Sequence, residues 1–247
     1  MKKIFKYIYG PIQSRRQGNA LGVDVFRKKV CSFDCVYCEV GKTESFAWEK
    51  NHFATTEEVA EELREALNQC SDIDVICFEG MGEPTLHREL GDIIDAARQV
   101  SNLPISIITN SAHVNQARVV EALLKADILL PSLNSALQTS FDQINRPQST
   151  VDASRVIEGL VDLRTRFAGE MWLEVFIVPG VNDDPANLGA LAEAICRIHP
   201  DKVQLNTLQR PGTEEWVIPA PREQLEKIAE ILGPRTQVIA TGSVNLS

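Results

Sequence analysis

Short apolar segments alternate with amphipathic segments along most of the chain. The apolar segments lie at 20–26, 74–79, 105–110, 127–133, 171–178 and 202–208, and helical patterns begin at Thr55 and follow near 86–100, 113–125, 152–166, 184–198 and 222–232. Near-continuous apolar strands separated by amphipathic helices predict a parallel sheet covered by helices. About six strand–helix units are fewer than the eight of a closed barrel. The pattern therefore predicts an α/β fold, either a partial barrel with an open side or a flat doubly wound sheet.

Three cysteines lie close together at Cys31, Cys35 and Cys38. This spacing offers three thiolates to one iron–sulfur cluster, and a four-iron cluster with three cysteine ligands keeps one iron open to a substrate or cofactor. Structural zinc would need a fourth ligand, and no second cysteine pair or His-x-x-x-His segment follows Cys38. Six scattered cysteines without a signal peptide do not suggest a disulfide framework. The spacing favours an iron–sulfur cluster, with zinc and inert thiols as alternatives.

The other three cysteines have structural explanations. A capping box at Thr55 and Glu58 begins a helix, and Cys70 continues the apolar stripe of that helix, so we expect it in the core. Cys77 belongs to an apolar strand and Cys196 to a helix. Neither lies in a second cysteine cluster, so we expect no auxiliary iron–sulfur site.

The chain has 247 residues, a formal net charge of −9 and a pI near 5.0. This length suffices for one domain with a buried core, which we expect to span residues 1–247. No apolar run approaches the roughly 20 residues of a membrane span, so we expect a soluble, cytoplasmic protein with no membrane partner. The acidic balance disfavours broad capture of nucleic acid, which relies on many basic contacts to phosphate. A local basic patch at residues 14–16 leaves nucleic acid open as a partner.

Polar and glycine-rich segments follow the predicted strands. Ligands collect at the carboxyl ends of parallel strands, where loops vary without disturbing the core. The glycines in segment 79–85 would let a ligand approach the backbone, although a tight turn before a helix explains them equally well. Hydroxyl and amide groups at strand ends can bind a ligand or cap a helix. The candidate binding residues at the later strand ends are Thr109, Asn110, Ser132, Asn134, Val178, Gly180 and Asn206.

Tyr37 stands immediately before the last of the three clustered cysteines. The segment resembles the Cys-x-x-x-Cys-x-aromatic-Cys signature of the radical S-adenosylmethionine (SAM) superfamily. The resemblance implies a 4Fe-4S cluster on Cys31, Cys35 and Cys38, whose open iron is chelated by the amino and carboxylate groups of SAM. It also implies that Tyr37 lies near the adenine, although an aromatic that simply covers the cluster is the alternative. The fold it implies is a partial (β/α)6 TIM-like barrel with parallel strands.

A second segment carries the same resemblance. Gly80, Met81, Gly82 and Glu83 precede Pro84, and they resemble the superfamily's Gly-Gly-Glu-Pro segment with Gly82 at the second glycine. The resemblance implies that the backbone and acid of this segment contact the SAM ammonium. With SAM as the ligand, Thr109 and Asn110 are candidates to hydrogen-bond its ribose or carboxylate, and the turn at Val178 and Gly180 is suited to packing against its adenine. Ser132, Asn134 and Asn206 are further candidates to face the ligand.

Further segments of the sequence resemble those of one subgroup within the superfamily. Residues 10–16, 21–24, 82–86, 144–147 and 205–211, with the cysteine segment, are similar to short radical SAM proteins related to wyosine-forming tRNA enzymes. Asn134 stands in a Leu-Asn-Ser segment where the group has a Leu-Asp-Ala-like one, so the charge of that acid is missing. The extra cluster-binding cysteines and the tRNA-handling extension of the wyosine enzymes are not visible. The resemblance therefore does not carry tRNA activity over.

The activity that the resemblance implies is reductive cleavage of SAM, within the oxidoreductases or transferases. An external one-electron donor such as flavodoxin or ferredoxin reduces the cluster, and the resulting 5′-deoxyadenosyl radical abstracts hydrogen from an unidentified small-molecule or macromolecular substrate. The protein holds the substrate C–H in place and excludes water, and no side chain need act as a general base. Arginines that can grip a substrate phosphate or carboxylate, or simply lie solvated on the surface, are Arg15, Arg16, Arg146 and Arg210.

Other interpretations stay open at this point. A glycyl-radical enzyme activase is a protein-modifying class of comparable size, and a non-catalytic iron–sulfur or zinc protein would only bind a partner. SAM cleavage by reduced protein would exclude the binding-only role. The histidines have no close metal-like spacing, and we expect capping or solvated roles for His52, His87, His113 and His199.

Overall fold

The structure is a computed structural model that describes residues 4–43, 53–147 and 151–239. Its centre is one curved sheet in which the strand order follows the chain, and the strands β2 to β8 are parallel while β1 is antiparallel to β2. The strands are β1 (Ile8–Ser14), β2 (Gly18–Val23), β3 (Val75–Phe78), β4 (Ile105–Thr109), β5 (Ile128–Pro131), β6 (Glu170–Ile177), β7 (Lys202–Thr207) and β8 (Thr236–Val238).

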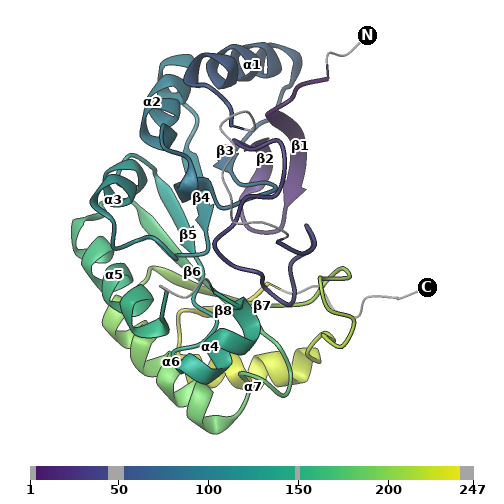
Figure 1. The fold of residues 1–247 in the computed structure, drawn as a ribbon, viewed down its shortest axis with the longest axis vertical. Helices are drawn as coiled ribbons and strands as arrows, with labels where there is room; N and C mark the ends of the chain where they lie inside the picture. The colour runs from purple at the N-terminus through teal and green to yellow at the C-terminus, as the bar shows by residue number, and fades with distance from the viewer. Residues whose placement is uncertain (1–3, 44–52, 148–150, 240–247) are drawn as a thin grey trace.

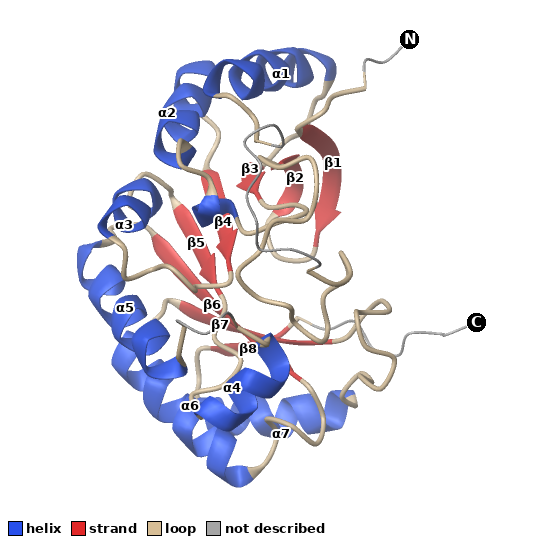
Figure 2. Cartoon of the chain, viewed as in Figure 1, coloured by secondary structure: helices blue, strands red, loops and turns tan. Residues whose placement is uncertain are grey.

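Helices follow each of the six strands from β2 to β7. They are α1 (Thr56–Gln69), α2 (Leu90–Val100), α3 (Ala117–Leu123), α4 (Gln138–Asn145), α5 (Ala153–Arg166), α6 (Pro185–Ile198) and α7 (Arg222–Leu232), with a 3₁₀ turn η2 (Pro84–Leu86) before α2. Figures 1 and 2 show α1, α2, α3, α5, α6 and α7 along the outer side of the curved sheet. A doubly wound sheet would have helices on both faces. The partial (β/α)6 barrel is therefore confirmed, and the flat-sheet alternative is wrong.

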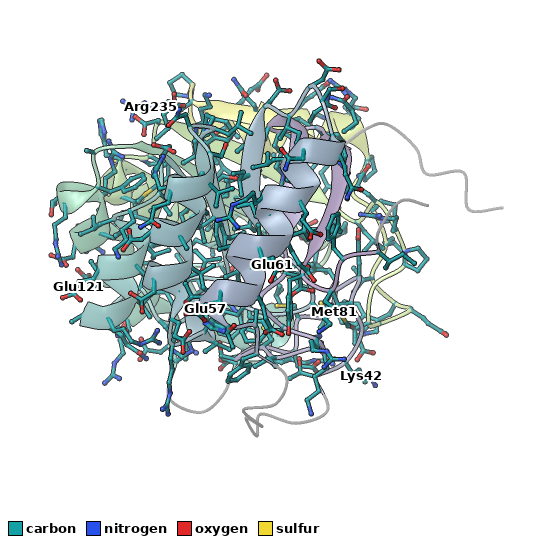
Figure 3. All side chains as sticks on the ribbon, turned by 90° about the horizontal axis from the view of Figure 1, so that it is seen from above. Lys42, Glu57, Glu61, Met81, Glu121 and Arg235 are labelled. Atoms are coloured by element: carbon teal, nitrogen blue, oxygen red, sulfur yellow. The ribbon has the colours of Figure 1, made fainter. Side chains whose placement is uncertain are left out.

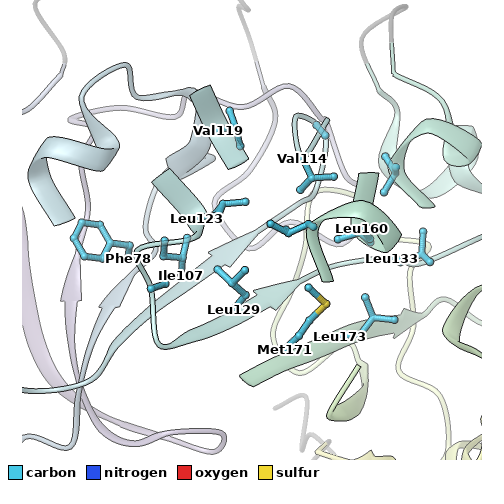
Figure 4. Packing of buried hydrophobic residues seen from close by; sticks show 14 of the residues in the cluster. Phe78, Ile107, Val114, Val119, Leu123, Leu129, Leu133, Leu160, Met171 and Leu173 are labelled. Carbon is cyan, nitrogen blue, oxygen red and sulfur yellow. The ribbon is translucent and has the colours of Figure 1, made fainter. Parts of the chain in front are cut away.

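Side chains of alternate strand residues point to the helices or into the barrel. The outward set packs against the helices in one apolar cluster that includes Phe78, Ile107, Leu129, Met171 and Leu173 (Figure 4). Helix residues such as Leu123 and Leu160 complete that cluster. Burial of these side chains between sheet and helices is the main force that holds the barrel wall together.

Some elements differ from the expectation. The short α4 and β8 and the strand β1 were not predicted, since β1 is largely exposed and has no apolar period. The predicted helix 113–125 is shortened to Ala117–Leu123 because turns occupy the residues before it. The capping box of Thr55 and Glu58 is present. The core assignment of Cys70 is wrong, because this residue is half-buried at the C-cap of α1.

The two ends of the barrel differ in what they carry. The cysteine loop and the glycine-rich segment follow the carboxyl ends of β2 and β3. Figure 3 shows Met81 and Lys42, from these two segments, on the side of the molecule opposite Arg235, which precedes β8. The open side of the barrel lies between β1 and β8, and Arg15 in the β1–β2 turn donates a hydrogen bond across it to the carbonyl of Ile239 at 3.3 Å.

Candidate functional site

The loop that carries the three cysteines is fastened to the end of α4. The Asp34 N–H donates to the carbonyl of Asn145 at 3.0 Å, and the Val36 N–H donates to that of Ile144 at 3.0 Å. Arg146 ends α4 in the left-handed conformation (φ 43°), which turns the chain toward the loop. The Ile-Asn-Arg-Pro segment of the sequence comparison is thus the seat of the cysteine loop.

Each of the three cysteine sulfurs accepts hydrogen bonds. Cys31 Sγ accepts from the Phe33 N–H and from Asn110 Nδ2, both at 3.4 Å. Asn145 Nδ2 lies 3.4 Å from Cys35 Sγ, and Lys29 Nζ lies 3.4 Å from Cys38 Sγ. Amide and ammonium donors at sulfur stabilise thiolates, and hydrogen bonds to cluster sulfurs tune the reduction potential. The donor set therefore suits cysteines that bind an iron–sulfur cluster.

As free thiols, Cys31 and Cys35 hold their protons firmly. Burial, together with the neighbouring Cys35 thiol, raises the pKa of Cys31 to about 12. Burial raises the pKa of Cys35 to about 11, although the hydrogen bond from Asn145 opposes it. Within the described residues, no group of three or more His, Cys, Asp or Glu side chains is arranged to hold a metal ion. Binding of a cluster would therefore displace the protons of these thiols.

The glycine-rich segment packs closely on the cysteine loop. A Cβ at Gly82 would lie 2.3 Å from the carbonyl oxygen of Val30, the residue before Cys31, and a Cβ at Gly80 (φ 152°) would lie 2.3 Å from the carboxyl carbon of Asp24. The Asp24 carboxylate accepts a hydrogen bond from the Met81 N–H at 2.9 Å. Only glycine permits these approaches. The two glycines therefore fix the position of the cysteine loop over the end of β3, and the Met81 side chain is exposed.

Glu83 is buried at the junction of two strand ends. Its Oε1 accepts hydrogen bonds from the hydroxyls of Thr85 (2.7 Å) and Thr109 (2.6 Å), and its Oε2 accepts one from the Asn110 N–H at 2.7 Å. Burial raises the pKa of this carboxyl, and the hydrogen bonds only partly oppose that effect. Glu83 and Thr109 thus orient Asn110, whose side chain reaches Cys31.

Tyr37 joins the cysteine loop to the strands on the other side of the barrel. Its ring stacks on Phe176 with 3.9 Å between centroids, and its hydroxyl accepts a hydrogen bond from Asn134 Nδ2 at 2.7 Å. Asn134 Oδ1 in turn accepts from the Phe176 N–H at 3.0 Å. Asn182 closes the turn that contains Gly180, because its Oδ1 accepts a hydrogen bond from the Val178 N–H at 2.9 Å. Asn182 Nδ2 also donates to the Asn134 carbonyl at 2.7 Å, so the predicted SAM contacts Tyr37, Asn134 and Val178 form one connected group.

The interior of the barrel holds a largely buried ion pair, whose side chains are 14% (Arg16) and 12% (Glu174) exposed. Arg16 Nη1 and Nη2 donate to the two carboxylate oxygens of Glu174 at 3.2 and 2.5 Å. Asn206 Nδ2 donates to Glu174 Oε1 at 3.0 Å, and Ser132 Oγ lies 3.5 Å from Oε2. Burial alone would raise the pKa of Glu174, but the charge and hydrogen bonds of Arg16 outweigh it and lower the pKa. Ser132 and Asn206, predicted as SAM contacts, are partners of this ion pair.

A cavity of about 380 Å³ opens between the β1–β2 turn and the cysteine loop. Arg15, Arg16 and Gln17 line it from the turn, and Tyr37 and Cys38 line it from the loop. The cavity is thus bounded on one side by a predicted cluster ligand and on the other by predicted substrate-binding arginines.

Three of the four predicted arginines, Arg15, Arg16 and Arg210, line this cavity, and all four have different partners. Arg146 contacts Glu214 at 2.6 Å and Arg210 contacts Glu39 at 2.7 Å, while Arg16 is held by Glu174. Arg15 donates to the backbone carbonyl of Ile239. Among the histidines, His87 is buried and its Nε2 lies 2.9 Å from the carbonyl oxygen of Ala54, whereas His52 lies outside the described residues.

Sequence reasoning missed several residues of this region. Glu174 is the central one, and its signal was a charged residue inside the apolar segment 171–178. Glu79 also lines the cavity, and burial raises its pKa while a hydrogen bond with Tyr9 opposes that effect. Lys29 and Asn145 donate to cysteine sulfurs. No spacing in the sequence relates these residues to their partners, because the fold alone brings them together.

A family model described as the radical SAM superfamily matches residues 27–192. The match covers the cysteine loop and the strands from β3 to β6. The chain therefore belongs to the radical SAM superfamily, whose members are enzymes that generally bind a 4Fe-4S cluster and SAM. The subgroup related to wyosine-forming enzymes stays a prediction.

This chain is similar in sequence to two curated proteins and similar in fold to a solved structure. A UPF0026 protein of Methanocaldococcus jannaschii is 30% identical over 96% of this chain and 74% of its own length. A protein named GTPase Obg from Brachyspira hyodysenteriae is 36% identical over 90% of this chain, but the chain spans only 33% of that protein, so its name does not carry over. A radical SAM methyltransferase from Sphaerobacter thermophilus is 19% identical, with a TM-score of 0.66 over 89% of this chain and 65% of that chain, and shows the shared fold.

No helix among the described residues is both long enough and apolar enough to cross a membrane.

Proposed function

We propose that this chain is a radical SAM enzyme in which Cys31, Cys35 and Cys38 hold a 4Fe-4S cluster and the adjoining strand ends hold SAM. When bound, the cluster and SAM supply a 5′-deoxyadenosyl radical that abstracts hydrogen from the substrate. We also propose that residues 1–247 form a single domain, that the protein is cytoplasmic, and that a one-electron donor such as flavodoxin or ferredoxin reduces the cluster.

The observation that carries the proposal is the set of donors around the three sulfurs. Asn110, Asn145 and Lys29 come from three different parts of the chain, and each places a side-chain nitrogen 3.4 Å from a different cysteine of the loop. Cys70, Cys77 and Cys196 lie outside this loop. Convergence of amide and ammonium groups on three neighbouring thiols supports an anionic cluster more than zinc or inert thiols.

The surrounding residues have distinct tasks in this proposal. Glu83 fixes Asn110 beside Cys31, and Gly80 and Gly82 with Met81 leave backbone groups at the loop edge for the SAM ammonium. Tyr37 would meet the adenine at the turn that contains Val178 and Gly180. The interior beneath Tyr37 would hold the substrate and exclude water, so that hydrogen is taken from one position only.

Anaerobic reconstitution tests this proposal. Purified protein should bind about four irons per chain and, when reduced, release 5′-deoxyadenosine from SAM. Cys31→Ala, Cys35→Ala and Cys38→Ala should each lose both the cluster absorbance and 5′-deoxyadenosine formation. Cys196→Ala, which changes an exposed cysteine on α6, is the matched control and should keep both.

Two results would overturn the proposal. One is anaerobically purified protein that holds zinc and no iron. The other is a reconstituted iron–sulfur cluster that survives in all three loop variants, which would place the ligands elsewhere.

A further inference from the structure

Lys29 contacts both the last cysteine of the loop and the residues that follow it. Its Nζ lies 3.4 Å from Cys38 Sγ and donates to the carbonyl oxygen of Gly41. The next residue after Lys29, Val30, is buried, and its carbonyl accepts a hydrogen bond from the Glu83 N–H at 2.8 Å. The backbone beside Lys29 is therefore held in place, and the side chain of Lys29 reaches from the start of the loop to its end.

The Cys38 side of this contact is held in place as well. The Gly41 N–H donates to the Cys38 carbonyl at 3.2 Å, and the hydroxyl of Thr213, from the segment after β7, donates to the same carbonyl at 3.1 Å. Lys29 itself is half-buried. Partial burial reduces the screening of its charge by water, so the ammonium acts on the neighbouring sulfur more strongly than a fully solvated lysine would.

Two other basic side chains at the loop already have a carboxylate partner. Lys42 lies 3.9 Å from Glu214, and Arg146 lies 2.6 Å from the same carboxylate. Among the described residues, the ammonium of Lys29 meets a backbone carbonyl and a sulfur but no carboxylate within ion-pair distance. Its positive charge is therefore available to balance negative charge at the cysteines.

Charge distinguishes the three side-chain donors at the sulfurs. Asn110 and Asn145 present neutral amides to the first two cysteines of the loop, whereas Lys29 presents an ammonium to Cys38. Uptake of one electron adds one negative charge to a bound cluster. A fixed positive charge beside a ligand sulfur stabilises that added charge, and the charge around a cluster is one of the factors that set its reduction potential. Lys29 should therefore favour the reduced cluster more than either amide does.

We propose that Lys29 is a positioning residue that acts through Cys38, and that its ammonium, held against the Cys38 sulfur, raises the reduction potential of the cluster. The electron comes from the external one-electron donor, which is oxidised as the cluster is reduced. A higher potential lets a weaker donor perform this step. This inference rests on the proposed function, because it assigns to Lys29 a role toward the cluster that the three loop cysteines hold.

A redox titration of the anaerobically reconstituted full chain tests this inference, and it needs neither SAM nor a substrate. Dithionite and mediators set the solution potential, and electron paramagnetic resonance measures the reduced cluster. Lys29→Met should lower the midpoint potential, so that the ratio of reduced to oxidised cluster at a given solution potential falls about tenfold, or about 59 mV for a one-electron couple. The iron content should equal that of wild type, because the three cysteine ligands remain.

Further variants separate the charge of Lys29 from its hydrogen bond. Lys29→Gln keeps an N–H donor without the charge and should lower the midpoint potential as Lys29→Met does. Lys29→Arg keeps the charge and should restore most of the wild-type midpoint potential. Lys42→Met is the matched control at the same loop. The Lys42 side chain is 66% exposed and pairs with Glu214, so its loss should leave the midpoint potential unchanged.

Failure of this inference can be told apart from failure of the proposed function. Equal midpoint potentials of wild type and Lys29→Met, or an equal decrease in Lys29→Met and Lys29→Arg, would overturn the role of the charge. Loss of iron from Lys29→Met would also overturn it, because Lys29 would then be a structural residue of the loop. These results leave the proposed function intact if the wild type holds the cluster and cleaves SAM. A wild-type chain that holds no iron–sulfur cluster would overturn the proposed function and this inference with it.

Discussion

The two faces of β6 show how one strand serves stability and chemistry separately. Met171, Leu173 and Val175 point outward and are fully buried in the apolar cluster beneath the helices. Glu174 and Phe176 alternate with them and line the cavity inside the barrel. The outward face gains stability from packing alone, whereas the inward face must satisfy each charge with a specific partner. The barrel interior is thus organised by polar pairing, and the barrel wall by apolar burial.

The largest expected effect is on the inward face. Glu174→Ala leaves the Arg16 guanidinium buried without its carboxylate, and removal of one partner of a buried pair costs about 3–5 kcal/mol. Urea denaturation should show this loss in the free energy of unfolding. Glu158→Ala is the matched control, because Glu158 forms an exposed pair with Arg197 at 2.5 Å and should cost less than about 1 kcal/mol.

A double variant distinguishes the effect of an unpaired charge from the effect of lost packing. Arg16→Met with Glu174→Met removes both charges, and replacement of a whole buried pair by apolar groups is often neutral for stability. We therefore expect the double variant to unfold at a urea concentration closer to wild type than Glu174→Ala does. Equal losses in the single and double variants would mean that packing, and not the charge, explains the effect.

On the outward face of the same strand, Leu173→Ala should lower the free energy of unfolding by about 3 kcal/mol. The loss arises because apolar burial is reduced and a cavity is left behind. The same urea denaturation measures it. No partner substitution should rescue Leu173→Ala, whereas Arg16→Met should partly rescue Glu174→Ala. Rescue of neither variant would contradict the distinction between the two faces.

The sequence predicted the outward face better than the inward one. The predicted strands 171–178 and 202–208 lie within one residue of β6 and β7, because their outward residues are regularly apolar. The cysteine loop was found from spacing that is local in the chain. Glu174 was missed because its partner Arg16 lies 158 residues away, and no local pattern relates the two. The different partners of the four arginines could not be predicted for the same reason, because the carboxylates that pair with Arg16, Arg146 and Arg210, and the Ile239 carbonyl that Arg15 contacts, lie far away in the chain.

A smaller effect is expected where β2 faces the interior. A Cβ at Gly22 would lie 2.2 Å from the Tyr9 ring, so Gly22→Ala forces the β1–β2 hairpin to shift and should cost about 1–3 kcal/mol. Gly189→Ala is the matched control on α6, where a Cβ meets nothing within 4 Å. Since alanine favours helix over glycine, Gly189→Ala should stabilise by about 0.5–1 kcal/mol. Thermal denaturation of the two variants should therefore shift in opposite directions.

The smallest expected effect is on the pH dependence of stability, to which two carboxylates of the interior contribute in opposite ways. The pKa of Glu174 is lowered in the folded chain, because the charge of Arg16 outweighs the effect of burial, so its stabilising contribution is present above about pH 4.5 and is lost as pH falls through the folded pKa. Burial raises the pKa of Glu79, so its contribution is present below about pH 4.5 and is lost as pH rises through its folded pKa.

Substitution by glutamine should therefore change the pH dependence of stability in opposite senses. Glu174→Gln should remove part of the loss of stability on acidification, and Glu79→Gln should remove part of the loss on raising the pH above about 4.5. Urea midpoints measured from pH 3.5 to pH 7 would test both, with Glu158→Gln as the exposed control. If Glu174→Gln and Glu79→Gln changed the pH dependence of the urea midpoint in the same sense, the prediction would be wrong. The ion pair of Arg16 and Glu174 would then titrate together with Glu79 as one electrostatic unit.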